Sequence, residues 1–223
     1  MKFTKWFFLA LILIISLAII CPAQTLLKRF KPGTTYRYEG TMQVKAHWMV
    51  DTGKGPQTLS SEVTIYPSRQ MGKEAVLPVK QTLFGHITFQ FLAEDKEGIY
   101  VYAIQGPTDP EPQISPGKHY KLKYPMEIGT AWNYQTDKGE AFSCRITAKE
   151  LVTVVAGNFE CLRIEQAGKA DFQGQISNFK GYEWLDLNGQ TIKSYVEFQI
   201  NDPVMGQPAT FQISLQLASI VKQ

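Results

Sequence analysis

Residues 125–164 read PMEIGTAWNYQTDKGEAFSCRITAKELVTVVAGNFECLRI, and this stretch decides the fold class. Phe142, Cys144 and Ile146 alternate with polar residues, as in a strand that has one face on a core and the other on water. Ala156-Gly157-Asn158 follows a second run of strand-forming residues and supplies the positive-φ residues that a tight hairpin turn needs. The stretch therefore predicts consecutive antiparallel strands joined by short turns.

The rest of the chain repeats this pattern of strands and turns. Residues 35–50 alternate over a long run, and Asp186-Leu187-Asn188-Gly189 is a strong hairpin signal. Residues 94–98 form another polar turn that ends in glycine. No window beyond the N-terminal segment shows a helical period. The sequence therefore predicts an all-β, antiparallel fold of about ten to twelve strands, built as a long-stranded sheet, a half-barrel or a barrel.

A faint internal repeat divides the predicted fold into two related halves. The pattern Gly-Thr-x-aromatic-x-Tyr occurs at residues 33–38 and again at residues 129–134. On this basis we expect one β half at residues 24–105 and a second at residues 125–223. Residues 106–124 are rich in proline, which lacks the N–H donor of a strand ladder. They are therefore predicted to connect the halves without joining either ladder.

The N-terminal segment predicts export. Lys2 and Lys5 precede an apolar run from residue 6 to residue 20. Residues 1–23 are therefore predicted to be a cleaved signal peptide, which is the only helix expected in the chain. An uncleaved membrane anchor and lipidation at Cys21 are the alternatives. Each of the three places the rest of the chain outside the cytoplasm, either in the periplasm or secreted.

Composition argues against some functions. The net charge is only +3 and the basic residues form no cluster, so the chain lacks the electrostatic footprint of a nucleic-acid-binding protein.

Cys144 and Cys161 remain after removal of the signal, and such a pair in an oxidising compartment is commonly a disulfide. Two buried thiols are the alternative. No histidine accompanies the cysteines at ligand spacing, so no metal site is expected.

The second half of the chain carries motifs of a known family. A strand bearing Trp132 is followed by Val-Thr-Val at residues 152–154, a glycine turn, and Phe-x-Cys-x-x-Ile at residues 159–164. Trp184 followed by Asn188-Gly189 matches the ending of the same pattern. In these features the chain resembles the TapB-like family of exported bacterial β-proteins. The resemblance implies an exported β-protein and supplies no catalytic residues to carry over.

Sequence motifs of catalysis are missing. The chain contains no Gly-x-Ser-x-Gly elbow and no His-Glu-x-x-His motif, and His47, His86 and His119 are far apart in sequence. We therefore expect no catalytic residues, no metal ligands and no cofactor. The leading interpretation is an exported, non-enzymatic β-protein that binds a hydrophobic small molecule, such as a lipid, or an envelope protein. An envelope scaffold, an outer-membrane barrel and a hydrolase are the alternatives, and the oligomeric state is left open.

Aromatic residues mark the expected ligand surface. They fall mainly on the apolar faces of the predicted strands, where the alternative is ordinary core packing. A concave sheet with no helix to cover it would expose that face, and exposed apolar patches commonly mark binding sites. The candidate ligand-facing side chains are Tyr36, Trp48, Trp132, Tyr134 and Trp184.

Overall fold

A computed structural model describes residues 26–46, 55–135, 140–172, 175–201, 206 and 208–222. The expected signal peptide at residues 1–23, with its Cys21, and the expected ligand-facing Trp48 lie outside this part of the chain. The elements are the 3-10 helix η1 (Leu26–Arg29) and the strands β1 (Thr34–Ala46), β2 (Gln57–Ile65), β3 (Arg69–Met71), β4 (Glu74–Leu83), β5 (His86–Asp95), β6 (Gly98–Gln105), β7 (Gln113–Lys123), β8 (Ala131–Gln135), β9 (Ala141–Val154), β10 (Gly157–Phe172), β11 (Gln175–Asp186), β12 (Thr191–Asn201) and β13 (Pro208–Lys222).

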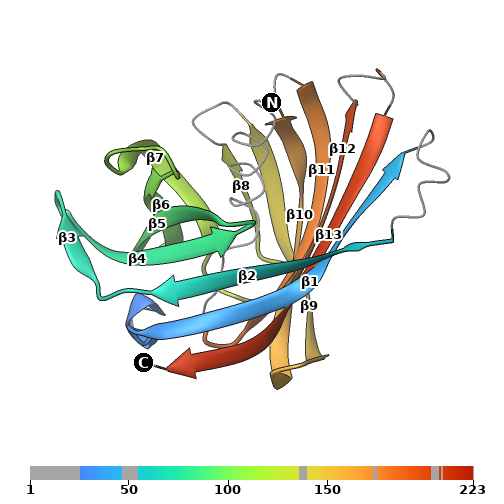
Figure 1. The fold of residues 1–223 in the computed structure, drawn as a ribbon. Helices are drawn as coiled ribbons and strands as arrows, with labels where there is room; N and C mark the ends of the chain where they lie inside the picture. The colour runs from blue at the N-terminus through green and yellow to red at the C-terminus, as the bar shows by residue number, and fades with distance from the viewer. Residues whose placement is uncertain are drawn as a thin grey trace.

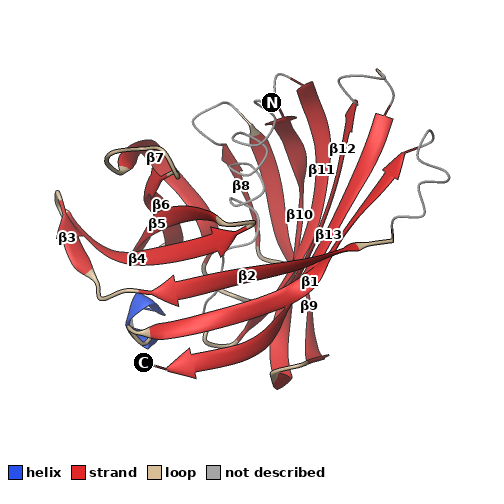
Figure 2. Ribbon diagram, viewed as in Figure 1, coloured by secondary structure: helices blue, strands red, loops and turns tan. Residues whose placement is uncertain are grey.

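The described strands form one antiparallel sheet that curls into a nearly closed barrel (Figure 1). The strand order is β7-β6-β5-β4-β2-β1-β13-β12-β11-β10-β9-β8, with the short β3 paired to β4. The chain meanders from strand to strand, and its first and last strands, β1 and β13, pair in the middle of the sheet. Strands make up almost all of the regular structure (Figure 2). The prediction of an all-β, antiparallel fold is confirmed.

Strand β1 shows how the sequence pattern builds the sheet. Its polar positions Arg37, Glu39, Thr41, Gln43 and Lys45 are all exposed, as the alternation predicts. Tyr38 lies on the opposite, inner face and is buried. Gly40 shares that inner register, and a Cβ atom there would lie 1.8 Å from the carbonyl oxygen of Ser214 on β13. Glycine therefore permits the close approach of the first and last strands.

The inner face of the barrel carries the main hydrophobic core. One contiguous cluster draws on both halves of the chain, and its fully buried members include Leu83, Ile99, Leu122, Ile146 and Leu217. Burial of this apolar face is the main stabilising contribution to the fold. A smaller cluster lies on the other face of β4–β6, next to β3. Its buried members are Val76, Phe91, Ala93, Tyr100 and Ala103.

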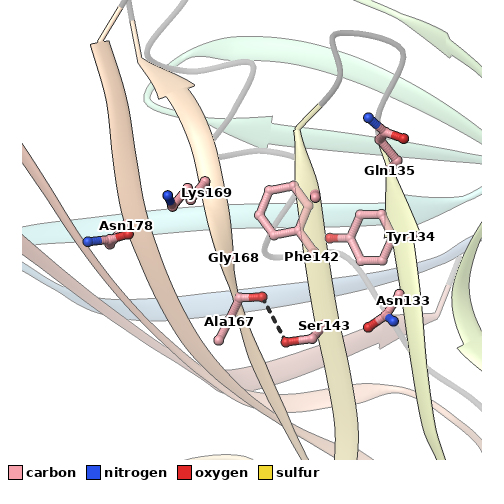
Figure 3. A pocket seen from close by; sticks show the side chains of 10 residues that line it. Asn133, Tyr134, Gln135, Phe142, Ser143, Ala167, Gly168, Lys169 and Asn178 are labelled. Atoms are coloured by element: carbon pink, nitrogen blue, oxygen red, sulfur yellow. Dashed lines mark hydrogen bonds between the residues drawn. The ribbon is translucent and has the colours of Figure 1, made fainter.

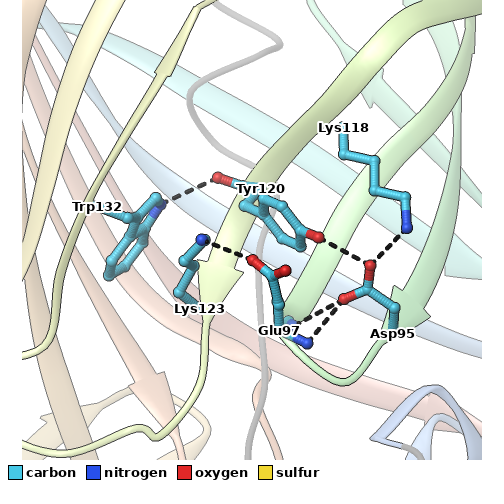
Figure 4. Close-up of polar contacts among 7 residues, drawn as sticks. Asp95, Glu97, Lys118, Tyr120, Lys123 and Trp132 are labelled. Atoms are coloured by element: carbon cyan, nitrogen blue, oxygen red, sulfur yellow. Dashed lines mark hydrogen bonds and ion pairs between the residues drawn. The ribbon is translucent and has the colours of Figure 1, made fainter.

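The two edge strands, β7 and β8, meet through a side chain. Within the described residues no strand ladder joins them. The indole Nε1 of Trp132 on β8 donates to the carbonyl oxygen of Tyr120 on β7 at 3.0 Å (Figure 4). The Tyr120 hydroxyl in turn donates to Asp95 at 2.8 Å, and Lys118 Nζ lies 2.6 Å from the same carboxylate. We call the junction between β7 and β8 the seam. Trp132 links β8 to β7 across this seam, and Tyr120 and Lys118 link β7 to the β5–β6 turn.

Most boundaries agree with the sequence pattern, and one expectation is wrong. The turn predicted at residues 94–98 joins β5 to β6, and the turn predicted at residues 186–189 joins β11 to β12. Residues 106–124, however, do join a ladder, because Gln113–Lys123 forms β7 and pairs with β6. Pro116 is tolerated there because β7 is an edge strand, where a missing N–H donor breaks no central ladder.

The internal repeat stays a prediction. The first half contributes β1, β2 and β4–β7 to the sheet, and the second contributes β8–β13. Both sets meander in the same direction around the barrel. The described residues contain thirteen strands rather than ten to twelve. The additional strands are β3, which has only three residues, and β7, which contains Pro116.

Candidate functional site

Two adjoining hollows lie over strands β8–β11 on the outside of the barrel. The first has a volume of ≈ 660 Å³ and is shown in Figure 3. The second has a volume of ≈ 600 Å³ and lies farther along the same strands. Both hollows are lined by Asn133, Ser143, Ala167, Gly168 and Asn178, so they form one continuous surface. We call this surface the outer groove.

The alternation of the strands explains why the groove is hollow. On β9 the exposed Ser143 stands between Phe142 and Cys144, whose side chains are buried in the core. The outward positions at the centre of the groove carry only small side chains, and Ser143 Oγ donates to the carbonyl oxygen of Ala167 at 3.2 Å. At Gly168 a Cβ atom would lie 2.4 Å from the Ala141 carbonyl oxygen, so a larger residue cannot enter without moving β9.

Polar and charged side chains border the outer groove, most of the exposed lining is apolar, and one end is aromatic. Its amide and charged side chains are Asn133, Gln135, Arg145, Glu165, Gln166, Lys169, Asn178 and Lys180. Tyr182 closes one end, with its ring 6.2 Å from that of Trp184 and 6.1 Å from that of Tyr195. Such a surface offers both hydrogen-bond donors and acceptors beside a flat aromatic area. It is suited to contact an extended molecule that offers both apolar and polar groups.

A second polar cluster lies on the inner face of β2, β4 and β5. The register places Gln81 opposite Thr88, with Ser61 and Gln90 offset by two residues on the same face. Each of the four is at most 2% exposed. Among the described residues, Ser61 Oγ, Thr88 Oγ1, Gln90 Nε2 and both polar side-chain atoms of Gln81 have no hydrogen-bond partner. We call these four residues the inner polar patch.

Buried charges lie next to the inner polar patch. Lys121 on β7 donates from Nζ to Gln90 Oε1 at 2.7 Å. Burial lowers the pKa of Lys121 to about 7, while the charge of Glu183 acts in the opposite direction. Glu183 on β11 is also buried and accepts a hydrogen bond from Thr191 Oγ1 at 2.6 Å. The inner face of the described strands therefore holds a lysine that gives up its proton more readily than an exposed lysine, and a carboxylate, within a largely apolar core.

The inner polar patch is unusual because burying polar groups without hydrogen-bond partners costs free energy of folding. A buried polar group without a partner costs about 1–3 kcal/mol. The unpartnered atoms of the patch therefore carry a combined cost of the same order as the whole stability of a typical domain, about 5–15 kcal/mol. Polar groups are kept at such positions when water or a ligand satisfies them.

The expected ligand-facing aromatic residues do not gather on one surface. Trp132 is only 5% exposed and lies at the seam, and Tyr36 is half-buried on β1. Tyr134 borders the outer groove and stacks on Phe142, with ring centroids 4.9 Å apart. Trp184 lies on the outer face of β11, where its indole N–H donates to the Glu150 carboxylate. The structure therefore brings only Tyr134 to the outer groove and Trp184 near its end.

The expected disulfide between Cys144 and Cys161 is wrong. Both are buried free thiols. The two cysteines do lie on neighbouring strands, but Cys144 pairs with Gln166 and Cys161 with Glu150. This register separates them by five residues along β10, or about 16 Å at the usual rise per residue. A disulfide needs Cα atoms closer than about 7 Å, so the cysteines act as small apolar core residues.

Both thiols are expected to be unreactive in the folded protein. Burial raises the pKa of Cys161 to about 12 and raises the pKa of Cys144 well above its ordinary value. At pH 8 neither group forms the reactive thiolate to a useful extent. Alkylation with iodoacetamide of the chain from residue 24 onward, which lacks Cys21, should add no label to the native protein and two labels after unfolding without reductant, as counted by intact mass spectrometry. Labelling of the native protein, or none after unfolding, would contradict this.

The described residues lack two further features. They contain no group of three His, Cys, Asp or Glu side chains placed to hold a metal ion. They also contain no helix with the length and apolar character needed to span a membrane. Sequence reasoning did not find the outer groove, because its small and polar residues occupy outward positions that read as an ordinary solvated face.

Comparisons with known proteins give only distant similarity. No family model matches the chain, and no curated protein matches it. A Bacteroides fragilis protein described as a candidate exported protein with a YmcC-like fold is similar in structure, with a TM-score of 0.43, 12% identity, and coverage of 86% of this chain and 97% of that chain. A Parabacteroides distasonis protein described as a candidate lipoprotein has a TM-score of 0.37, 12% identity, and coverage of 86% and 96%. Likeness at this level does not indicate function, and the TapB-like relationship stays a prediction.

Proposed function

We propose that the chain is an exported, non-enzymatic β-barrel protein that binds an envelope partner through the outer groove. Export rests on the charged start and the apolar run at residues 6–20. Membership of the TapB-like family belongs to the same proposal and rests on the motifs at residues 129–164. The partner is another molecule of the cell envelope that presents an extended segment with both apolar and charged groups.

The continuity of the two hollows across four strands is the observation that carries this function. A groove that runs over β8–β11 matches an extended segment better than a compact ligand. Its charged walls include both signs, with Arg145 and Lys180 on one hand and Glu165 on the other. Complementary charges on a partner would therefore set the register of binding. A scaffold that recruits partners elsewhere on the barrel is the alternative.

Filling the groove tests the proposal. Ala167 is an exposed strand residue at the centre of the groove, so Ala167→Trp is expected to fold normally and to block the surface. Capture of the partner from an envelope extract, quantified by mass spectrometry, should fall at least tenfold relative to the unchanged protein, which is roughly the effect of losing 1.4 kcal/mol of binding free energy.

A matched variant controls for the added ring. Ala75 is exposed on β4, away from the groove, so Ala75→Trp should capture the partner as well as the unchanged protein does. Equal capture by Ala167→Trp and Ala75→Trp would rule out the groove and leave the scaffold alternative. No specific capture by the unchanged protein would remove the partner itself.

A further inference from the structure

Three members of the inner polar patch, Gln81, Thr88 and Gln90, form a compact group of side chains. Directly opposite residues on antiparallel strands have Cβ atoms about 4.5–5.5 Å apart, and diagonal neighbours about 7–8 Å. Gln81 and Thr88 are directly opposite, and Ser61 and Gln90 are diagonal neighbours of Gln81. Ser61 and Gln90 are displaced in opposite directions from Gln81, so the side chains within reach of one small bound group are Gln81, Thr88 and Gln90.

The chemistry of the patch is rich in donors. Its groups without partners among the described residues are two hydroxyls, the Gln90 amide nitrogen, and the amide nitrogen and oxygen of Gln81. Lys121 adds a cation that is already in contact with Gln90. The only amide oxygen of the patch that still needs a hydrogen-bond donor is Gln81 Oε1, because Gln90 Oε1 accepts from Lys121. Groups of this kind match a ligand with several acceptor atoms and a negative charge, and a carboxylate is the simplest such group.

The surroundings of the patch are apolar. Val63, Val79 and Leu83 alternate with the polar residues on the same strands and belong to the main core cluster. A bound carboxylate would therefore place the rest of its molecule among aliphatic side chains. Lys121 lies on β7, the edge strand at the seam, where no described ladder joins β7 to β8.

We propose that the inner polar patch, with Lys121, binds the carboxylate of an apolar acid of the fatty-acid class inside the barrel. Gln81, Thr88 and Gln90 donate hydrogen bonds to the carboxylate, and Lys121 supplies the opposite charge. Glu183, the buried carboxylate whose charge acts on Lys121, is held by Thr191 on the other side of the barrel. This site and the outer groove lie on opposite faces of the sheet, so either assignment can fail alone.

Calorimetric titration of the protein as the cell exports it, with decanoate and with decanol, tests this site. The two probes share a tail and differ in the carboxylate, so decanoate should bind saturably and decanol at least tenfold more weakly. Thr88→Val and Gln81→Leu remove groups without partners among the described residues and are expected not to lower the melting temperature. Each should weaken decanoate binding at least tenfold. Thr58→Val, on the exposed face of β2, should bind decanoate like the unchanged protein.

Three results would overturn the proposal. Absence of saturable decanoate binding would mean that ordered water alone satisfies the patch. Equal affinity for decanoate and decanol would mean that the tail alone is recognised. Unchanged decanoate binding by folded Thr88→Val and Gln81→Leu would place the acid elsewhere. The comparison of the two probes needs no variant, so it remains decisive if a substitution prevents folding.

Discussion

Replacing Trp132 with alanine is expected to lower the free energy of unfolding by about 3–5 kcal/mol, which is the usual cost of deleting a buried large aromatic side chain. The ring is 5% exposed and lies in the main core cluster. It also supplies the hydrogen bond that links β8 to Tyr120 on β7. Denaturant unfolding followed by circular dichroism measures this change directly.

A conservative variant separates the two contributions of this ring. Trp132→Phe keeps most of the buried apolar area and loses the indole N–H, so it should cost about 1–2 kcal/mol. A loss below about 1 kcal/mol for Trp132→Ala would contradict a barrel seam held by this side chain. In that case β7 and β8 would be held together by other contacts.

Replacing Gly40 with alanine is expected to destabilise the barrel by about 3 kcal/mol, at the upper end of the range for overpacking. The added Cβ would lie 1.8 Å from the Ser214 carbonyl oxygen and 2.9 Å from the Leu215 Cα. Both contacts are with backbone, so relief requires β1 and β13 to separate where the first and last strands pair. Thermal unfolding of the variant measures the effect as a lower melting temperature.

Gly55→Ala is the matched control, because a Cβ atom at Gly55 meets nothing within 4 Å. This change should leave the melting temperature nearly unchanged, or raise it slightly by reducing the freedom of the unfolded chain. A Gly40→Ala protein as stable as the Gly55→Ala protein would show that β1 does not approach β13 closely, and the pairing of the chain ends would then be wrong.

Strand periodicity was enough to predict the fold class. The alternation in residues 35–50 and the polar turns at residues 94–98 and 186–189 are local signals, and local backbone chemistry determines strands and tight turns. The closure through β1 and β13 joins the two ends of the chain, and no local pattern contains that information. Local pattern also could not predict β7. Pro116 lacks an N–H donor, and β7 can be a strand only because it lies at the edge of the sheet, where it pairs with β6 alone.

The disulfide prediction failed because it used only the adjacency of two strands. Neighbouring strands bring two cysteines together only when the register also aligns them, and here the two-residue turn at Val155-Ala156 sets a register that offsets Cys144 from Cys161. Register follows from the turn and from the whole buried face. The sequence positions of the two cysteines do not contain it.

The inner polar patch had a signal in the sequence that periodicity could have revealed. Gln81 stands between Val79 and Leu83 on one strand face, and Ser61 stands between Leu59 and Val63 on another. A polar residue inside an apolar period is a local inconsistency, and such inconsistencies concentrate at functional positions. The outer groove carried no such signal, because Ser143, Ala167 and Asn178 are ordinary residues for an exposed strand face.

Binding of an envelope partner at the outer groove can be tested at single residues. A photo-crosslinking amino acid placed at Asn178, at Ser143, or at Thr58 on the exposed face of β2 tests this directly in living cells. The account predicts that the positions Asn178 and Ser143 crosslink to the same partner and that Thr58 does not. Crosslinks of equal yield at Thr58, or a partner captured only there, would contradict it.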